Sequence, residues 1–234
     1  MSRIVVGFSF VDFFDKRRRL HQETALNILA SHPPLVFPVS FGFSKSSQRP
    51  KILEELKIPH LNILNKNSSN IINNNRDLPY IKEILDRCSS IDCDVFGYIN
   101  SDILIPAVVY DILQLNFDAY IFSRSDIGEI DPQSFLEGKI NVIHGGNQHS
   151  GADGFFFKKS WWNCNRNRFP DNLIMGSPEW DTVYRTVIKK SPCRYLEARA
   201  LFHVYHTQTW AETSPSALNN IAIWEEIKKT YRIK

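Results

Sequence analysis

The sequence predicts an α/β fold in which a mostly parallel central sheet carries helices on both faces. Strand-like and helix-like patterns alternate three times before residue 100, and this alternation is typical of parallel strands joined by crossover helices. The 234 residues are 43% hydrophobic and 23% charged, which fits one large globular domain. We therefore expect a single domain over residues 1–234, with residues 1–105 and 106–234 as its two halves.

Local patterns predict the elements of the first half. Runs rich in β-branched and aromatic residues indicate strands, and apolar residues three or four positions apart indicate helices. Pro33-Pro34 ends the first helix, while Asp77 and Pro79 suit the first turn of the third. The expected elements are a strand over 4–10, a helix over 15–30, a strand over 35–43, a helix over 48–56, a strand over 60–64, a helix from Asp77 and a strand over 94–99.

The second half is less regular. Its clearest helix follows Ser177, a candidate N-cap, because Trp180, Val183 and Tyr184 begin an apolar stripe along one helical face. Residues 145–153 contain three glycines and are expected to form a polar loop. The other expected elements are a helix from Pro106, strands over 118–122, 141–144 and 154–157, a short strand near Tyr195, a segment over 202–206 that leads to Trp210, and a terminal helix over Pro215–Tyr231.

The composition argues against several classes of protein. Lys and Arg exceed Asp and Glu by only 28 to 25, and the densest basic run, residues 16–19, fits a solvated helix face better than a nucleic-acid contact. The apolar runs are too short to cross a bilayer. The four cysteines lack the C-x-x-C spacing of zinc sites. We expect a reduced, cytoplasmic protein with no transmembrane segment and no nucleic-acid partner.

The most informative candidate site is Asn100-Ser101-Asp102. It ends a strand-like run, and in parallel sheets ligands bind at the carboxyl ends of the strands. A carboxylate with neighbouring amide and hydroxyl oxygens can hold a divalent cation. Such a cation neutralises negative charge on a departing diphosphate. The structural alternative is that Asp102 only caps the helix expected from Pro106.

In this position the motif resembles the D-x-D-like motif of GT-A-type nucleotide-diphospho-sugar transferases, with one carboxylate where many members have two. The three preceding βα units and the helix start Asp77-Leu78-Pro79-Tyr80-Ile81-Lys82 fit the same family. The resemblance covers roughly residues 3–210. It implies a Rossmann-like fold of GT-A type, a nucleotide-binding first half and an acceptor-binding second half. It also implies a Mn²⁺ or Mg²⁺ ion on the donor diphosphate, held by Asp102.

Two later segments fit this family as well. Glu179-Trp180-Asp181, followed by Arg185, is similar to the acidic helix start of inverting members, where a carboxylate acts as general base on the acceptor hydroxyl. The alternative is that both acids complement the helix dipole. Residues 151–157, which include Asp153, resemble the glycine-aromatic loop that shapes the sugar and acceptor pocket. The alternative there is a turn that feeds a buried strand.

The resemblance also suggests a late histidine as the last metal ligand, and His203 or His206 could serve. On a straight strand, side chains three residues apart point to opposite faces, so both could bind one metal only if the segment bends. His144 and His149 are weaker candidates. The expected donor-binding residues are Ser9, Phe10, Asn75, Arg76, Lys82, Asn100, Ser101 and Asp102.

The expected function is metal-assisted, inverting transfer of a hexosyl or related sugar from a nucleotide-diphosphate donor to an acceptor hydroxyl. The sequence leaves the acceptor and the oligomeric state unassigned. It lacks the P-loop and G-x-G-x-x-G motifs, which argues against a P-loop NTPase and a dinucleotide dehydrogenase. Two other classes remain open. One is a metal-dependent hydrolase of a phosphate or sugar derivative that uses Asp102, Asp153 and the late histidines, and the other is a non-catalytic nucleotide-sugar-binding protein.

Overall fold

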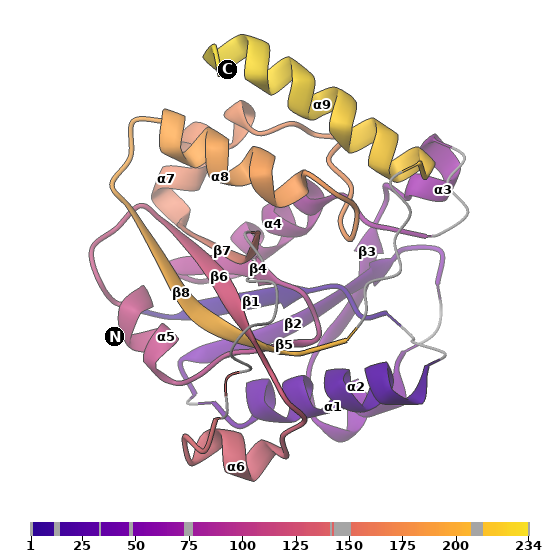
Figure 1. Cartoon of the computed structure of the whole chain (residues 1–234), viewed down its shortest axis with the longest axis vertical. Coiled ribbons are helices and arrows are strands. Elements are labelled where there is room, and N and C mark those ends of the chain that lie inside the picture. Colours follow the sequence, from indigo (N-terminus) through magenta and orange to yellow (C-terminus); the bar gives the residue numbers. More distant parts are fainter. Residues whose placement is uncertain are drawn as a thin grey trace.

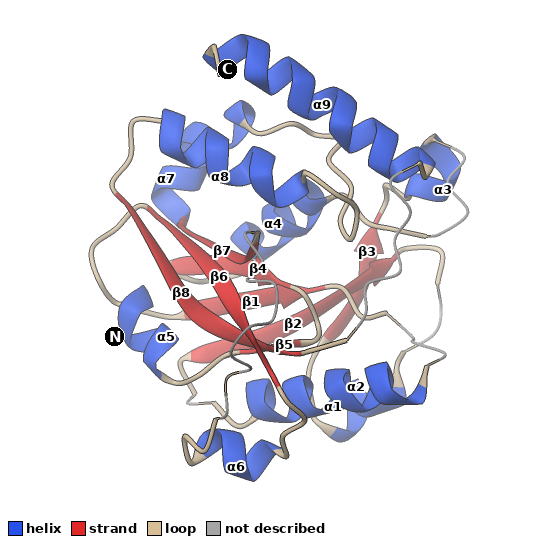
Figure 2. Cartoon of the chain, in the orientation of Figure 1, coloured by secondary structure: helices blue, strands red, loops and turns tan. Residues whose placement is uncertain are grey.

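Eight strands form one sheet with helices stacked on both faces (Figure 1, Figure 2). The computed structural model describes residues 2–11, 15–32, 34–46, 49–72, 77–140, 142, 151–206 and 213–233. The strands in this part of the chain are β1 (Ile4–Phe8), β2 (Val36–Phe43), β3 (His60–Leu64), β4 (Val95–Ile99), β5 (Ile103–Leu104), β6 (Ala119–Ile127), β7 (Ala152–Lys158) and β8 (Tyr195–Val204). The helices are α1 (Lys16–Ala30), α2 (Lys51–Glu55), α3 (Ser68–Ile71), α4 (Ile81–Ser90), α5 (Val108–Leu113), α6 (Pro132–Leu136), α7 (Lys159–Asn165), the 3-10 turn η1 (Arg166–Arg168), α8 (Trp180–Lys190) and α9 (Pro215–Tyr231).

The strand order is β3-β2-β1-β4-β7-β6-β8-β5. Strands β3, β2, β1 and β4 are parallel, as three successive crossover units predict, whereas β7 is antiparallel to both β4 and β6. β8 then runs parallel to β6, and the short β5 pairs antiparallel with β8. The predicted mostly parallel sheet with helices on both faces is confirmed. These directions bring the carboxyl ends of β1, β4, β6 and β8 and the start of β7 to one edge.

Alternating side chains along the strands divide the core into two layers. Val5 of β1 packs on the side of α4, α7, α8 and α9, whereas Val6 packs on the side of α1, α2 and α5. In β7, Phe155 and Phe157 lie in the first layer and Phe156 lies in the second, each with no exposed surface. The expectation that these aromatic residues shape a pocket is therefore wrong. Burial of each ring stabilises the fold by about 1.5–3 kcal/mol.

The start of α4 differs from the prediction. The helix begins at Ile81 rather than at Asp77, because residues before it pair with another segment. Tyr80 forms an isolated antiparallel bridge with Ile174, and the Met175 amide donates to the Pro79 carbonyl oxygen at 3.0 Å. Pro79 also disfavours the helical conformation for the residue that precedes it.

Two more expectations in the second half need correction. Ser177 is not the N-cap of α8, since that helix begins at Trp180 after Glu179, whose φ of 68° is left-handed. The strand expected over 118–122 continues to Ile127. Of the strand expected over 141–144, only Val142 is described, in a bridge with Ile127, and the rest lies outside the described residues, as do His144, His149 and Trp210. No helix in the described part of the chain has the length and apolar character needed to span a bilayer.

Gly97 of β4 lies opposite Phe156 of the neighbouring strand β7. We expect Gly97→Ala to destabilise the fold. A Cβ there would collide with the Phe156 ring and with the Phe155 carbonyl oxygen, so the sheet itself must shift. The expected loss is about 3 kcal/mol of unfolding free energy, at the upper end of overpacking effects. Urea denaturation measures it. Gly128→Ala is the matched control, because its Cβ meets nothing within 4 Å, and equal losses in the two variants would contradict this account.

Candidate active site

A cleft of about 620 Å³ lies at the edge of the sheet where the strand ends meet. Residues from both halves of the chain line it. Seven of the predicted site residues lie in its wall: Asn100, Asp102, Asp153, Glu179, Asp181, His203 and His206. Its other lining residues are Arg18, Arg124, Gly151, Ala152, Gly176, Ser177, Pro178, Trp180, Thr182, Arg185, Thr186 and Lys189.

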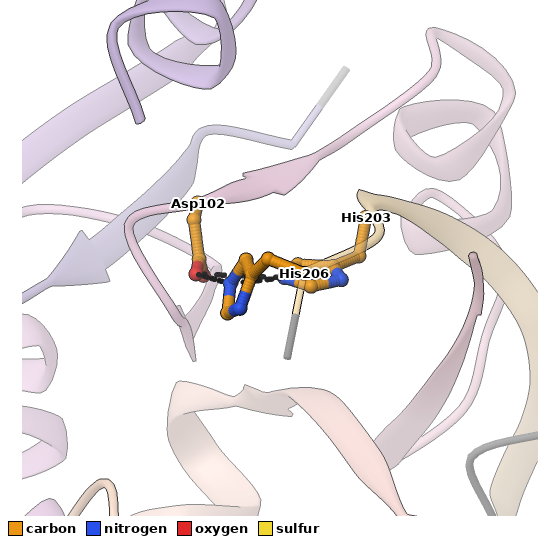
Figure 3. A group of neighbouring side chains, drawn as sticks. All are labelled: Asp102, His203 and His206. Carbon is orange, nitrogen blue, oxygen red and sulfur yellow. Dashed lines mark hydrogen bonds and ion pairs between the residues drawn. The ribbon is translucent and has the colours of Figure 1, made fainter. Parts of the chain in front are cut away.

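Asp102, His203 and His206 form a compact cluster in this cleft (Figure 3). The pairing of β5 with β8 places Ile103 opposite His203, which sets the preceding residue, Asp102, beside the end of β8. β8 stops at Val204, so the chain bends before His206 and both imidazoles can turn toward the same carboxylate. The bend that the sequence required for two histidines to share one ion is therefore present.

The donor atoms of this cluster have the spacing of metal ligands. Oδ2 of Asp102 lies 3.6 Å from Nε2 of His203 and 3.5 Å from Nε2 of His206, and the two Nε2 atoms are 3.1 Å apart. Ligand bonds of about 2.1 Å give ligand separations of about 3.0–3.5 Å at octahedral to tetrahedral angles. One carboxylate and two imidazoles suit Mn²⁺ or a similar divalent cation. The residues present thus fit a bound cation.

The charges of the cluster favour an ionised carboxylate. Burial opposes ionisation of Asp102, but hydrogen bonds and charge from His203 and His206 outweigh it and hold the pKa of Asp102 well below its usual range. Burial also opposes protonation of His203, but the Asp102 and Asp126 carboxylates outweigh it and raise the pKa of this imidazole. The Asp102 carboxyl is therefore ionised at neutral pH.

Asp126 contacts the ring nitrogen of His203 that faces away from Asp102. β6 and β8 pair with Asp126 opposite His203, and Nδ1 of His203 lies 3.0 Å from Oδ1 of Asp126. A carboxylate on Nδ1 fixes the ring and leaves the Nε2 lone pair directed at the cluster, as in many metal sites. His203 is 3% exposed at its side chain, so this orientation is set by the fold.

Arg18 contacts the second histidine of the cluster, His206. Its Nε and Nη2 atoms lie 3.3 and 3.1 Å from Nδ1 of His206. A guanidinium only donates, so this Nδ1 accepts and the proton of a neutral His206 is on Nε2. Nε2 of His206 lies 3.1 Å from Nε2 of His203, and Nδ1 of His203 lies 3.0 Å from Oδ1 of Asp126. Polar contacts therefore link Arg18, through both imidazoles, to Asp126.

Arg124 carries the buried positive charge of the site. Its Nη1 donates to Oδ1 of Asp153 at 2.8 Å, and its Nε lies 3.4 Å from Oδ1 of Asp126. Asn100 Nδ2 donates to the same Asp153 oxygen at 3.3 Å. The side chains of Arg124 and Asp153 are only 7% and 6% exposed. One guanidinium therefore pairs with two carboxylates and joins the cluster to the start of β7.

The start of α8 brings two further carboxylates to the cleft. Trp180 points into the core and packs edge-on against Tyr98 and Phe155, so Glu179 and Asp181 flank it at the cleft wall. Oδ2 of Asp181 accepts the Ala152 amide at 3.0 Å. Glu179 holds a left-handed backbone conformation, which is costly for a residue with a side chain and is frequent at functional sites.

The other predicted donor-binding residues lie elsewhere. Ser101 is buried and accepts a hydrogen bond from Gln22 at 2.7 Å. Lys82 pairs with Asp171 at 2.6 Å in a separate pocket. Ser9 and Phe10 follow β1 without lining the cleft, and Phe10 packs against the core layer of α1. Asn75 and Arg76 lie outside the described residues.

Sequence reasoning missed Arg18, Arg124 and Asp126. Arg18 lies in the basic run that was expected to be a solvated helix face, although a position one turn into the helix after β1 is close to the ligand-binding edge of the sheet. Arg124 and Asp126 lie on the part of β6 beyond Phe122 that was not expected to be strand. Their alternation with Ser123 and Ser125 is the signal that could have extended that strand.

We expect removal of the Arg124 charge to lower the free energy of unfolding. Arg124→Met leaves Asp126 and Asp153 buried without their shared cation, which costs about 3–5 kcal/mol in comparable pairs. Guanidinium denaturation measures this loss. Arg166→Met is the control, because that arginine is 49% exposed and its 3.5 Å pair with Asp86 is worth about 0–1 kcal/mol. A loss no larger for Arg124→Met than for the control would contradict the buried role of Arg124.

Sequence comparisons with protein-family models and with curated proteins find no match. Comparison with solved structures does. The S. aureus TarS 1–349 structure is similar with a TM-score of 0.53 and 12% identity, over 86% of this chain and 60% of that one. The chain thus spans less than two thirds of the TarS structure.

Glucosyl-3-phosphoglycerate synthase from Mycobacterium tuberculosis is similar over more of its length. Its complex with Mg²⁺ and uridine diphosphate has a TM-score of 0.53 and 10% identity, over 97% of this chain and 79% of that one. Its complex with Mn²⁺, uridine diphosphate and phosphoglyceric acid has a TM-score of 0.52 and 11% identity, over 97% and 78%. These similarities show that the chain has a fold of GT-A type.

Proposed function

We propose that the protein transfers a sugar, of hexosyl or related type, from a nucleotide-diphosphate donor to an acceptor hydroxyl, with inversion and with the help of Mn²⁺ or Mg²⁺. The observation that carries the proposal is the convergence of Asp102, His203 and His206 at the end of β4 in a fold of GT-A type. Residues 1–105 would supply most of the nucleotide site and residues 106–234 most of the acceptor site.

The cation site would consist of Asp102, His203 and His206. A divalent cation there would neutralise the diphosphate that leaves the sugar. Arg18 lines the same cleft and would donate to the diphosphate oxygens, which its planar fork suits.

Asp181 is the proposed general base, with Glu179 as the other candidate. The Ala152 amide donates to Oδ2 of Asp181 at 3.0 Å, which orients the carboxylate and leaves its other oxygen for an acceptor hydroxyl. Asp153 is assigned a positioning role, because Arg124 and Asn100 both donate to its Oδ1.

A thermal-shift panel of UDP, GDP, CDP and dTDP, each with and without Mn²⁺, tests the donor class. We expect one nucleotide to stabilise the wild-type protein in a Mn²⁺-dependent manner, because a ligand at about 100 times its Kd adds roughly 2.7 kcal/mol. Asp102→Asn should lose the Mn²⁺-dependent part. A shift with the cation but with no nucleotide would contradict the proposal and favour a metal-dependent hydrolase.

Arg18→Gln should weaken binding of that nucleoside diphosphate in the presence of Mn²⁺ by about 10-fold, the loss expected for a charge-assisted hydrogen bond. Titration calorimetry measures it. Arg17→Gln removes the same charge one residue away, where the side chain pairs with Glu129 and is 61% exposed, and should change the affinity little. Equal effects of both substitutions would show that Arg18 acts only through long-range charge.

The base assignment predicts different effects for two isosteric substitutions. Asp181→Asn should reduce sugar transfer by about 100-fold or more with unchanged nucleotide affinity, while Glu179→Gln should retain most of the transfer. Product formation from the matching nucleotide sugar is the measurement. The reverse pattern would move the role to Glu179. Sugar transfer unaffected in both variants would point to another base, and no transfer by the wild-type protein would leave a non-catalytic binder as the explanation.

A further inference from the structure

The outer wall of the cleft carries a second polar surface that the proposed chemistry does not use. It is one face of α8 formed by Thr182, Arg185, Thr186 and Lys189, all of which line the cleft. Their spacing of three, four and seven residues puts them on one side of the helix. The opposite side, with Val183, Tyr184, Val187 and Ile188, is buried in the core. We call this surface the α8 cationic face.

Its two cations share one carboxylate. Glu197 of β8 pairs with Arg185 through Oε1 and with Lys189 through Oε2, the latter at 2.6 Å. Burial opposes ionisation of Glu197, but Lys189 and Arg185 outweigh it and lower the pKa of this carboxyl. Glu197 is not among the residues that line the cleft. It therefore holds both side chains at the wall.

The carboxylate that anchors this face lies far along β8 from the cation site. Glu197 and His203 are six residues apart on β8, which corresponds to about 20 Å along the strand. The candidate base lies closer, since Arg185 and Lys189 follow Asp181 by one and two helical turns, about 6 and 12 Å along α8. A molecule that offers a hydroxyl to Asp181 can thus extend toward these cations.

We infer that the acceptor is a hydroxylated molecule that carries a carboxylate or phosphate group, and that the α8 cationic face binds this group. The inference rests on the proposed transferase function. Arg185 offers a planar fork to two anionic oxygens and Lys189 a point charge, while the hydroxyls of Thr182 and Thr186 can donate to the same group. The reacting hydroxyl and the anion would be separated by about one to two helical turns.

The test uses matched neutral and anionic acceptors with the nucleotide sugar whose nucleotide binds best. The panel contains glucose, glucose 6-phosphate and glucuronate. Sugar transfer is measured together with inhibition of donor hydrolysis by water, so that an acceptor-site ligand is detected even if it is not glycosylated. We expect an anionic member of a set to bind at least 10-fold better than its neutral partner. The phosphate and carboxylate arms distinguish the two anion types.

Arg185→Gln and Lys189→Gln should each lower the preference for the anionic acceptor over its neutral partner by about 10-fold. Nucleotide affinity and donor hydrolysis should stay unchanged. Lys190→Gln is the control, because that lysine is exposed on the same helix and does not line the cleft. Equal use of neutral and anionic compounds, or an unchanged preference in the first two variants, would overturn the inference. Loss of folding stability without loss of preference would show that the ion pairs only join α8 to β8. A wild-type protein that neither binds a nucleotide nor hydrolyses a donor would contradict the proposed function itself, and the inference with it.

Discussion

The site depends on the charge balance around one buried arginine. Arg124 lies between Asp126 and Asp153 and pairs with both, so its loss would leave them without their shared cation. Asp126 orients the His203 ring, and Asp153 ties the start of β7 to Asn100 at the end of β4. A single cation therefore links the strand ends from which the cleft is built.

Strand direction explains why these residues meet. Three crossover units place β4 beside β1, and the reversal at β7 returns the chain to the edge where β4 ends. β6 and β8 then run in the same direction as each other, so Asp126 and His203 approach that edge together. β5, only two residues long, pairs with β8 just after Asp102. The cation cluster is thus assembled from strand ends far apart in sequence.

Much of the fold could be predicted from local patterns. The alternation of strand and helix before residue 100 and the long terminal helix depend on periodicity and on proline, which act over a few residues. The start of α4 could not be predicted this way, because Tyr80 forms a bridge with Ile174, which is far away in the sequence. The left-handed backbone of Glu179, after which α8 begins, could not be predicted either. Local sequence rules favour Ser177 as the N-cap of that helix.

The site was predictable only where residue type and position were both informative. Asp102 at the end of a strand and two histidines near the end of the chain suggested a cation site, yet their convergence depends on the register of β5 with β8. Arg18 and Arg124 are ordinary arginines in the sequence. The contacts of Arg124 with Asp153 and of Arg18 with His206 join residues 29 and 188 positions apart, which no short window contains.

The most direct test of the account is pulsed electron paramagnetic resonance of Mn²⁺ added to the wild-type protein. The geometry of Asp102, His203 and His206 predicts a single bound ion with hyperfine couplings to the nitrogens of two imidazoles, and loss of one set in His206→Ala. Mn²⁺ that binds without nitrogen couplings, or with couplings that survive His203→Ala and His206→Ala together, would contradict the claim that these side chains form the cation site.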